Sequence, residues 1–353
     1  MEFGIQLATS SEAWKVAQRA EELGFTHAWF YDTQMLCADP FVAMAASAMK
    51  TSKIRLATGV LIPSNRIAPA TACALASLNK LAPGRIDFGI GTGFTGRRAM
   101  GLPPVKLQDM AEYIRIVRAL LANETTEWEF ENKRRKIRFL NPEFGLINTD
   151  DEIPLHISAM GPKIRKLTAE LGAHWITACT DTESSVQVLR EMCETYRAEG
   201  KNPANYIKTA FAAGCVLLAG EACDSPRVKA QAGPFAAVIP HNLVESGVGD
   251  LNMPAASEMA DLIGAYRAAY DSYQPADAKY LSVHRGHALF LREEEEALIN
   301  GNFIRDVTFT GEIAELRDRL RVLRDAGYDR WAVQIPEKYP QAINDWARVI
   351  EDL

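Results

Sequence analysis

Apolar runs of strand length alternate with amphipathic stretches of helix length along most of this 353-residue chain. The alternation is typical of a parallel β-sheet covered by helices. Eight runs are predicted strands, at residues 3–8, 26–31, 54–62, 85–91, 154–159, 174–178, 209–218 and 330–335. Helices are predicted from Ser10 or Ser11 to Leu23, at 40–49, 68–81 and 107–121, from Gly161 and Pro162 onward, and at 183–199, 313–326 and 341–353.

The eight repeats favour a closed (β/α)8 barrel, although an open doubly wound sheet produces the same alternation. Two segments interrupt the repeat. Residues 126–140 form a polar, strand-like excursion, and residues 219–306 contain helix-like stretches at 256–270 and 293–300. Because the second segment is too long for a simple loop, we expect an insertion between strand seven and the following helix, packed over the carboxyl-terminal mouth. The whole chain, 1–353, is predicted to be one domain.

The composition is that of an ordinary α/β enzyme, with 48% hydrophobic and 24% charged residues. The net charge of −6 argues against nucleic acid as a partner, because neutralising phosphates requires clustered basic residues. The amino terminus enters a strand directly and no window approaches a membrane span, so we expect a cytoplasmic protein that does not bind a membrane. The six widely spaced cysteines predict reduced thiols and no metal site.

In a barrel of this kind the active site lies at the carboxyl ends of the strands. Asp32 ends strand two, where a carboxylate acts as a base or caps a turn. Strand three contains Thr58, Gly59 and Val60, and a glycine in an apolar run marks a bulge or the close approach of a flat ligand such as an isoalloxazine ring.

Two further strand ends are rich in glycine. Strand four ends in Gly91, Thr92 and Gly93, but the helix and acidic residue of a dinucleotide fingerprint are missing, so these glycines indicate a backbone pressed against a ligand or a tight turn. Strand five ends in Ala159, Met160, Gly161, Pro162 and Lys163, a helix start that suits a phosphate but is also common without one.

The segment 219–306 contributes three candidate histidines, His241, His284 and His287. No H-E-x-x-H motif or equivalent third ligand accompanies them, which argues against a metal. They are predicted to be substrate-facing acids or hydrogen-bond donors, with buried structural histidines as the alternative.

Several segments together resemble the bacterial-luciferase-like flavin oxidoreductases. Those segments are Ala20–Trp29, Ile54–Val60 leading to Pro63, Leu78–Gly93, Pro154–Pro162 and Thr310–Asp329, in the same order and over almost the whole chain. Within that superfamily, Leu81–Arg85, Gly101–Pro104 and His284–His287 are most similar to the branch of the deazaflavin-dependent methylenetetrahydromethanopterin reductases.

The resemblance implies a barrel with a mouth insertion, usually dimeric. It implies that Gly59 and Val60 form a non-prolyl cis bulge under the cofactor ring and that Asp32 lines the pocket. It also implies that Gly91–Gly93 lie along the cofactor and that Met160–Lys163 hold its phosphate. The cofactor-binding set is Thr58, Gly59, Val60, Gly91, Thr92, Gly93, Ala159, Met160, Gly161, Pro162 and Lys163; Asp32, His241, His284 and His287 are the catalytic candidates.

Two departures from the family pattern affect the expected chemistry. Members commonly have a histidine just after the acidic residue of strand two, where this chain has Thr33 and Gln34, and some monooxygenases have an arginine where Thr92 stands. Three functions are therefore weighed. The first is a monooxygenase using O2 and reduced FMN from a separate flavin reductase on a small organic substrate. The second is oxygen-independent hydride transfer with a deazaflavin, and the third is a non-catalytic flavin-binding protein.

Overall fold

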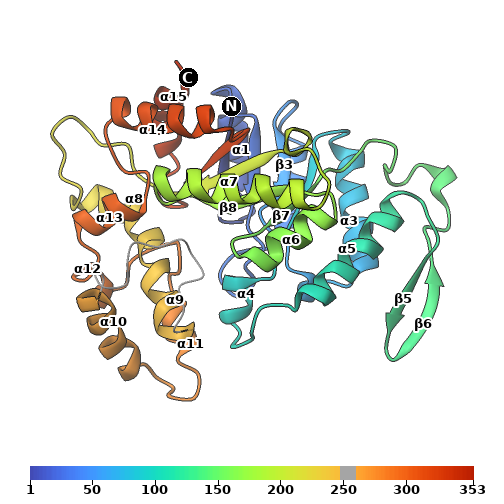
Figure 1. Ribbon diagram of the computed structural model, residues 1–353, viewed down its shortest axis with the longest axis horizontal. Coiled ribbons are helices and arrows are strands. Elements are labelled where there is room, and N and C mark those ends of the chain that lie inside the picture. Colours follow the sequence, from blue (N-terminus) through green and yellow to red (C-terminus); the bar gives the residue numbers. More distant parts are fainter. Residues whose placement is uncertain (247–259) are drawn as a thin grey trace.

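The computed structural model, which describes residues 1–246 and 260–353, is a closed barrel of eight parallel strands (Figure 1). Going round the ring, each strand pairs with its neighbours in the order β1-β10-β9-β8-β7-β4-β3-β2, and β1 pairs with both β10 and β2. The predicted (β/α)8 fold is therefore confirmed. The strands are β1 (Glu2–Leu7), β2 (His27–Phe30), β3 (Arg55–Thr58), β4 (Ile86–Ile90), β7 (Leu155–Ser158), β8 (His174–Ala178), β9 (Lys208–Ala212) and β10 (Arg330–Ile335).

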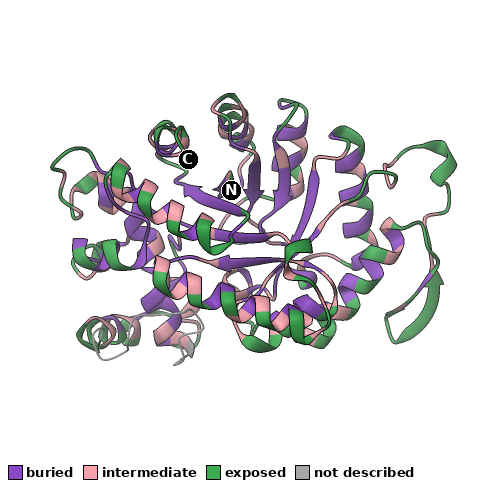
Figure 2. Cartoon of the chain, turned by 45° about the horizontal axis from the view of Figure 1, so that its top comes forward, coloured by how far each residue is buried: buried purple, intermediate pink, exposed green. Residues whose placement is uncertain are grey.

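Helices cover the outside of the barrel, and Figure 2 shows their inner faces buried and their outer faces exposed. In α14 (Ile313–Ala326), for example, Leu316, Leu320 and Leu323 lie on one face and are fully buried. Among the described residues, no helix is both long enough and apolar enough to cross a membrane. The covering helices are α1 (Ala13–Glu22), α2 (Pro40–Ala48), α3 (Ala68–Leu81), α5 (Leu107–Leu121), α6 (Pro162–Glu170), α7 (Thr182–Ala198), α14 (Ile313–Ala326) and α15 (Ala342–Ile350).

The barrel interior is filled in layers. At the amino-terminal end of the strands, buried Asp87 forms a salt bridge with Arg55, their closest atoms 2.5 Å apart, and Arg330 lies 3.5 Å from the same carboxylate. Above it, Trp29 packs edge-to-face against Phe211, with ring centroids 5.1 Å apart. This filling makes the lower barrel a solid core, so only the carboxyl-terminal end is left for a ligand.

Two strands end earlier than their apolar runs predict. The run 54–62 is a strand only as far as Thr58, where a bend leaves Leu61 bridged to Ile90. The run 209–218 is a strand only over Lys208–Ala212. Beyond it the chain leaves the barrel and hydrogen-bonds to residues 309–311, whose backbone packs so closely that a Cβ on Gly214 would lie 2.0 Å from the Phe309 carbonyl oxygen.

Between β9 and α14 the described residues form six helices, and only some of them were predicted. The helix expected at 256–270 is seen as α10 (Ala260–Ser272), and its first four residues lie outside the described part of the chain. The helix expected at 293–300 begins at Glu293 but ends at Glu296, and the Asn300 side chain accepts a hydrogen bond from the Phe303 amide and caps the next helix. The remaining helices are α8 (Pro226–Ala236), α9 (Val238–Ser246), α11 (Tyr280–Val283), α12 (Glu293–Glu296) and α13 (Gly301–Val307).

The polar excursion is an antiparallel hairpin of β5 (Thr126–Phe130) and β6 (Lys133–Ile137), as its pattern predicts. It projects from the body of the molecule (Figure 1), and its basic residues are exposed to solvent. Short 3-10 turns occur at Pro63–Asn65, Pro142–Phe144 and Pro203–Asn205. After β4 the chain forms a short helix, α4 (Phe94–Arg98), whose residues reach the barrel mouth.

Candidate active site

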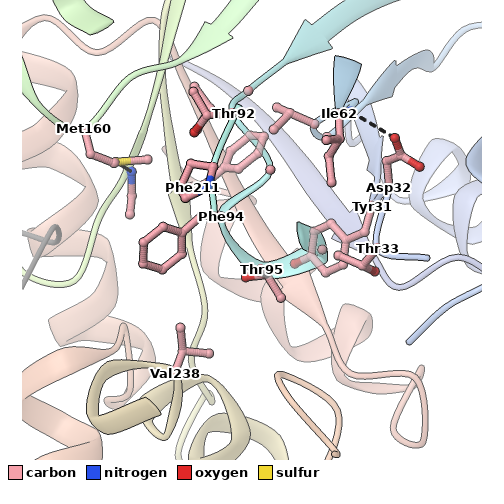
Figure 3. A pocket seen from close by; sticks show the side chains of 18 of the residues that line it. Tyr31, Asp32, Thr33, Ile62, Thr92, Phe94, Thr95, Met160, Phe211 and Val238 are labelled. Atoms are coloured by element: carbon pink, nitrogen blue, oxygen red, sulfur yellow. Dashed lines mark hydrogen bonds between the residues drawn. The ribbon is translucent and has the colours of Figure 1, made fainter. Parts of the chain in front are cut away.

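A cavity of about 750 Å3 opens at the carboxyl ends of the barrel strands. The strand-end loops form one side, and α8, α9 and residues 287–289 form the other. Phe94, Phe211 and Val238 line it together with a few polar side chains (Figure 3), so its wall is mostly apolar. Its position and lining are those of a ligand site in a barrel enzyme.

The Gly59–Val60 peptide bond at the cavity wall is cis, as the resemblance implies. The Gly59 amide donates to the Phe30 carbonyl at 2.7 Å, which ties the bulge to β2. A Cβ on Gly59 would lie 2.7 Å from the Cβ of Trp29. The glycine is therefore required by the packing of the barrel interior behind it, and its contact with a cofactor ring stays a prediction.

Asp32 lines the cavity, and its carboxylate is fully engaged. One oxygen accepts from the Ile62 amide at 2.9 Å (Figure 3), and Arg66 donates to both oxygens at 3.1 and 3.3 Å. Arg66 also pairs with Asp39, which caps α2. This network fixes the loop after the cis bond, so the geometry gives Asp32 a positioning role, and its service as a base stays a prediction.

The glycines after β4 allow the backbone to pass close to the bulge. A Cβ on Gly91 would lie 2.9 Å from Cγ2 of Val60, and Gly93 has a φ of 81°, a left-handed conformation that favours glycine. Thr92 lies between them on the cavity wall. Side chains at the two glycine positions would fill the space beside Val60 and Ile62.

Residues Met160–Lys163 bring the amino end of α6 to the cavity. Gly161 is the N-cap and Pro162 the first helical residue, and among the described side chains none caps this end. The free amides of the first turn and the helix dipole favour an anion here. Lys163 and Lys106, which precedes the first residue of the neighbouring α5, add exposed positive charges at the cavity.

Two of the predicted cofactor residues lie in the barrel wall, away from the cavity surface. The Thr58 hydroxyl donates to the Gly89 carbonyl at 2.6 Å and accepts from the Gly89 amide at 2.9 Å. Ala159 accepts from the Trp175 indole at 2.8 Å. Both support neighbours that line the cavity.

The three candidate histidines come together although His241 is more than 40 residues from the other two. His287 lines the cavity, and its Nδ1 lies 2.9 Å from Nδ1 of His241 and 3.3 Å from Nδ1 of His284. His241 then contacts Glu295 at 2.5 Å, and His284 contacts Glu245 at 2.9 Å. All three rings are buried, and burial lowers the pKa of His241 and His287. Within the described chain, no group of three or more side chains is arranged to hold a metal.

Several cavity residues were not predicted from sequence. Gln6 is one: it is a polar residue inside the first apolar strand, and its amide donates to the Ala332 carbonyl at 2.7 Å and the Ala212 carbonyl at 3.0 Å. A single polar residue within an apolar strand could have marked Gln6 as a candidate site residue. Phe211, Thr95 and the α8–α9 residues Phe235 and Val238 carry no such signal, because only the tertiary fold brings them to the mouth.

Comparison with known proteins is consistent with this geometry. Residues 4–330 match the family model described as luciferase-like monooxygenase. The 5,10-methylenetetrahydromethanopterin reductase of Methanolobus tindarius is 27% identical over 217 residues, which are 60% of this chain and 64% of the relative. The F420-dependent glucose-6-phosphate dehydrogenase of Kineococcus radiotolerans is 30% identical over 208 residues, 52% of this chain and 59% of that protein.

The matches to curated relatives are partial, whereas the structural match covers the chain. The chain spans 64%, 51% and 59% of the lengths of the first three curated relatives it matches. An F420-dependent secondary alcohol dehydrogenase, solved with an F420–acetone adduct, superposes with a TM-score of 0.69 at 18% identity. That superposition covers 99% of this chain and 98% of the dehydrogenase, which establishes the shared fold.

Proposed function

Since the chain belongs to the luciferase-like monooxygenase family, we propose that it is an oxidoreductase that binds the deazaflavin coenzyme F420 in the cavity at the barrel mouth. A bound deazaflavin would exchange a hydride with a small organic substrate, without oxygen. Two relatives of this chain are named as an F420-dependent dehydrogenase and a methylenetetrahydromethanopterin reductase, which supports the deazaflavin over FMN.

The observation that carries the proposal is the division of the cavity into an apolar part and a cationic rim. Gly59, Val60 and Gly91 offer a close backbone approach for a flat ring. The uncapped start of α6 offers amides for a phosphate, and Lys106 and Lys163 stand at the mouth, where an anionic tail would leave the pocket. The residues present thus fit a ring, a phosphate and a tail of negative charges.

The second candidate is the FMN- and O2-dependent monooxygenase, for which a separate reductase would supply reduced flavin. The description of the family and the apolar wall of Phe94, Phe211, Phe235 and Val238 favour it, because such a wall excludes water from an oxygen reaction. A small-molecule substrate is common to both candidates.

The homodimer stays a prediction. A non-catalytic flavin-binding barrel is the third candidate and ranks last.

The deciding experiment is titration of the purified protein with F420 and with FMN, each oxidised and reduced, followed by fluorescence or calorimetry. We expect F420 to bind more tightly than FMN. Preference for reduced FMN would replace the first candidate with the second, and binding of neither would overturn both.

A pair of lysine variants separates the tail from the ring. Lys106→Gln combined with Lys163→Gln should weaken F420 several-fold at low salt and have a smaller effect on a deazaflavin that lacks the phosphate and tail, because exposed charges contribute modestly and are screened. Lys166→Gln is the matched control: Lys166 lies on the same helix but pairs with Glu170 and Glu199. An equal loss for both ligands would show that the lysines do not hold the tail.

A further inference from the structure

The buried histidines form a branched chain that starts at the cavity. His287 lines the cavity, and its Nε2 lies 3.2 Å from the hydroxyl of Thr95, which also lines it. On its other side, the Nδ1 of His287 faces the Nδ1 atoms of both His241 and His284. Each of these two rings ends on a carboxylate through its Nε2, at Glu295 and Glu245 respectively.

The carboxylates fix where the protons lie. Burial alone would raise the pKa of Glu295, but hydrogen bonds from His241 and Arg292 outweigh burial and lower it, so Glu295 is a carboxylate that can only accept. His241, kept neutral by burial, therefore carries its proton on Nε2 and leaves Nδ1 as an acceptor. The Nε2 of His284 lies in the same way 2.9 Å from an oxygen of Glu245, and a ring that donates from Nε2 to that oxygen leaves its Nδ1 as an acceptor.

The tautomer of His287 follows from those of its neighbours. With acceptors at Nδ1 of His241 and His284, His287 must carry its proton on Nδ1 and share it between the two. Its Nε2 is then a lone pair on the cavity side, accepting from the Thr95 hydroxyl. A neutral imidazole with a free lone pair facing a substrate cavity is a general base.

The two branches differ in their access to water. The Glu295 side chain is 1% exposed. It also accepts hydrogen bonds from Tyr266 and Arg292, which hold it in one position. The Glu245 side chain is 12% exposed, and its carboxylate lies 2.9 Å from Nε2 of His284. Within the described part of the chain, Glu245 is the more exposed of the two carboxylates, so the second branch is the one that reaches solvent.

Resting on the proposed function, we propose that His287, His284 and Glu245 form a proton relay between the cavity and solvent, and that His241 with Glu295 sets its direction. His287 takes the proton of a substrate hydroxyl, directly or through Thr95. The substrate class is accordingly an alcohol, whose oxidation to a carbonyl releases one proton to the relay and one hydride to the deazaflavin.

Each proton transfer is balanced along the relay. The substrate O–H bond breaks as an Nε2–H bond forms on His287, and the Nδ1 proton of His287 passes to Nδ1 of His284. The Nε2 proton of His284 passes to Glu245, which releases it to water. Every ring stays neutral before and after, which matters because Arg98 on α4 and Arg292 face the cluster and oppose a positive charge on His287. Carbonyl reduction runs the same transfers backwards and restores the starting tautomers.

Nitrogen-15 NMR of the histidine-labelled full-length protein, without cofactor, measures directly which ring nitrogen of each histidine carries the proton. The chain has six histidines, so single substitutions assign every ring. We expect the Nδ1–H tautomer for His287 and the Nε2–H tautomer for His241 and His284. His174 is an internal reference, because its Nδ1 accepts the Ile207 amide at 3.0 Å and its proton must therefore lie on Nε2. An Nε2–H tautomer of His287 would overturn the relay.

Two carboxylate variants test the two branches. Glu245→Gln should slow the exchange of the His287 Nδ1 proton with water at least ten-fold while leaving its tautomer unchanged. Glu295→Gln should shift His287 toward the Nε2–H form. Glu294→Gln is the matched control, because the Glu294 carboxylate contacts Tyr273 and Arg292, and it should change neither property. Unchanged exchange in Glu245→Gln would exclude the solvent branch.

These measurements need no cofactor, so they fail independently of the proposed function. If the protein has the expected tautomers but does not bind F420, the proton relay is supported and the proposed hydride transfer is overturned. If it binds F420 but has other tautomers, the proposed function is supported and the relay is overturned.

Discussion

At the scale of single residues, Gly91 gives the clearest link between packing and cofactor binding. An alanine there would bring its Cβ to 2.9 Å from Cγ2 of Val60, so the Val60 side chain must move along the cavity wall. We expect Gly91→Ala to weaken F420 binding about ten-fold or more. Gly161→Ala, also at the cavity, meets nothing within 4 Å and should leave the fold intact and affinity nearly unchanged. Equal affinities of the two variants, measured by fluorescence titration, would remove Gly91 from the site.

The sequence identified individual residues of the site more reliably than the contacts that make those residues necessary. A glycine inside an apolar run marked Gly59 as special, and the cis bond is present. The close contact behind the glycine, however, is with Trp29, from a strand that the sequence could not place in register with it. Likewise His241 was recognisable as a candidate, but its partner Glu295 looked like one of four consecutive glutamates on a solvated helix. Only the fold buries that one carboxylate.

At the scale of elements, the start of α6 has a conflict between stability and binding. Gly161 occupies the N-cap with extended φ and ψ of −88° and 164°, and a side chain there meets nothing within 4 Å. An aspartate at this position can accept from the first-turn amides and stabilise the helix by about 1 kcal/mol. The same negative charge would occupy the amides proposed for the phosphate.

We therefore expect Gly161→Asp to raise the melting temperature and to weaken F420 binding, two changes of opposite sign. Differential scanning calorimetry of the apo protein and a binding titration measure them separately. Gly161→Ala controls for loss of the glycine itself. Undiminished affinity in the aspartate variant would show that the phosphate lies elsewhere.

Strands were predicted better than helices because their signal is local. All eight barrel strands follow apolar runs, which fully buried parallel strands produce. Helices α8 and α9 were missed because each contains a proline, Pro234 and Pro240, that reads as a break in sequence. In the structure these helices supply Phe235 and Val238 to the cavity, so the side of the cavity formed by residues after β9 was the least predictable.

At the scale of the whole molecule, the residues at one end of the barrel stabilise the fold, and those at the other end line the cavity. Asp87, at the end away from the cavity, is fully buried and lies within 4.0 Å of charged or titratable groups on four other strands: Arg55, Arg330, His156 and His27. Removing one member of a buried ionic network leaves the others uncompensated. We expect Asp87→Ala to lower the free energy of unfolding by about 3–5 kcal/mol in urea denaturation. Cofactor affinity of the folded variant should be unchanged, and a large loss would show that the ends are coupled.

Histidine burial makes the stability of the whole barrel depend on pH with a definite sign. Burial lowers the pKa of His27 from 6.5 to about 3, and it lowers the pKa values of His156, His174, His241 and His287 as well. The unfolded chain takes up protons on these side chains near pH 6.5, whereas the native barrel does not. Between these limits the unfolded state binds more protons, so stability must rise with pH.

We accordingly expect the free energy of unfolding to be fully present above about pH 7 and to fall as the pH drops from 6.5 toward 3. Each buried histidine contributes up to about 1.4 kcal/mol per pH unit. Urea denaturation at pH 8, 7, 6 and 5 measures the slope, which His174→Gln, on the more accessible ring, should reduce by one proton. Three of these rings lie at the amino-terminal end of the barrel and two lie beside the cavity, so a slope of more than three protons would show that both ends unfold together. A flat profile between pH 7 and 5 would mean that the histidines are protonated in the native state, which is incompatible with the neutral relay.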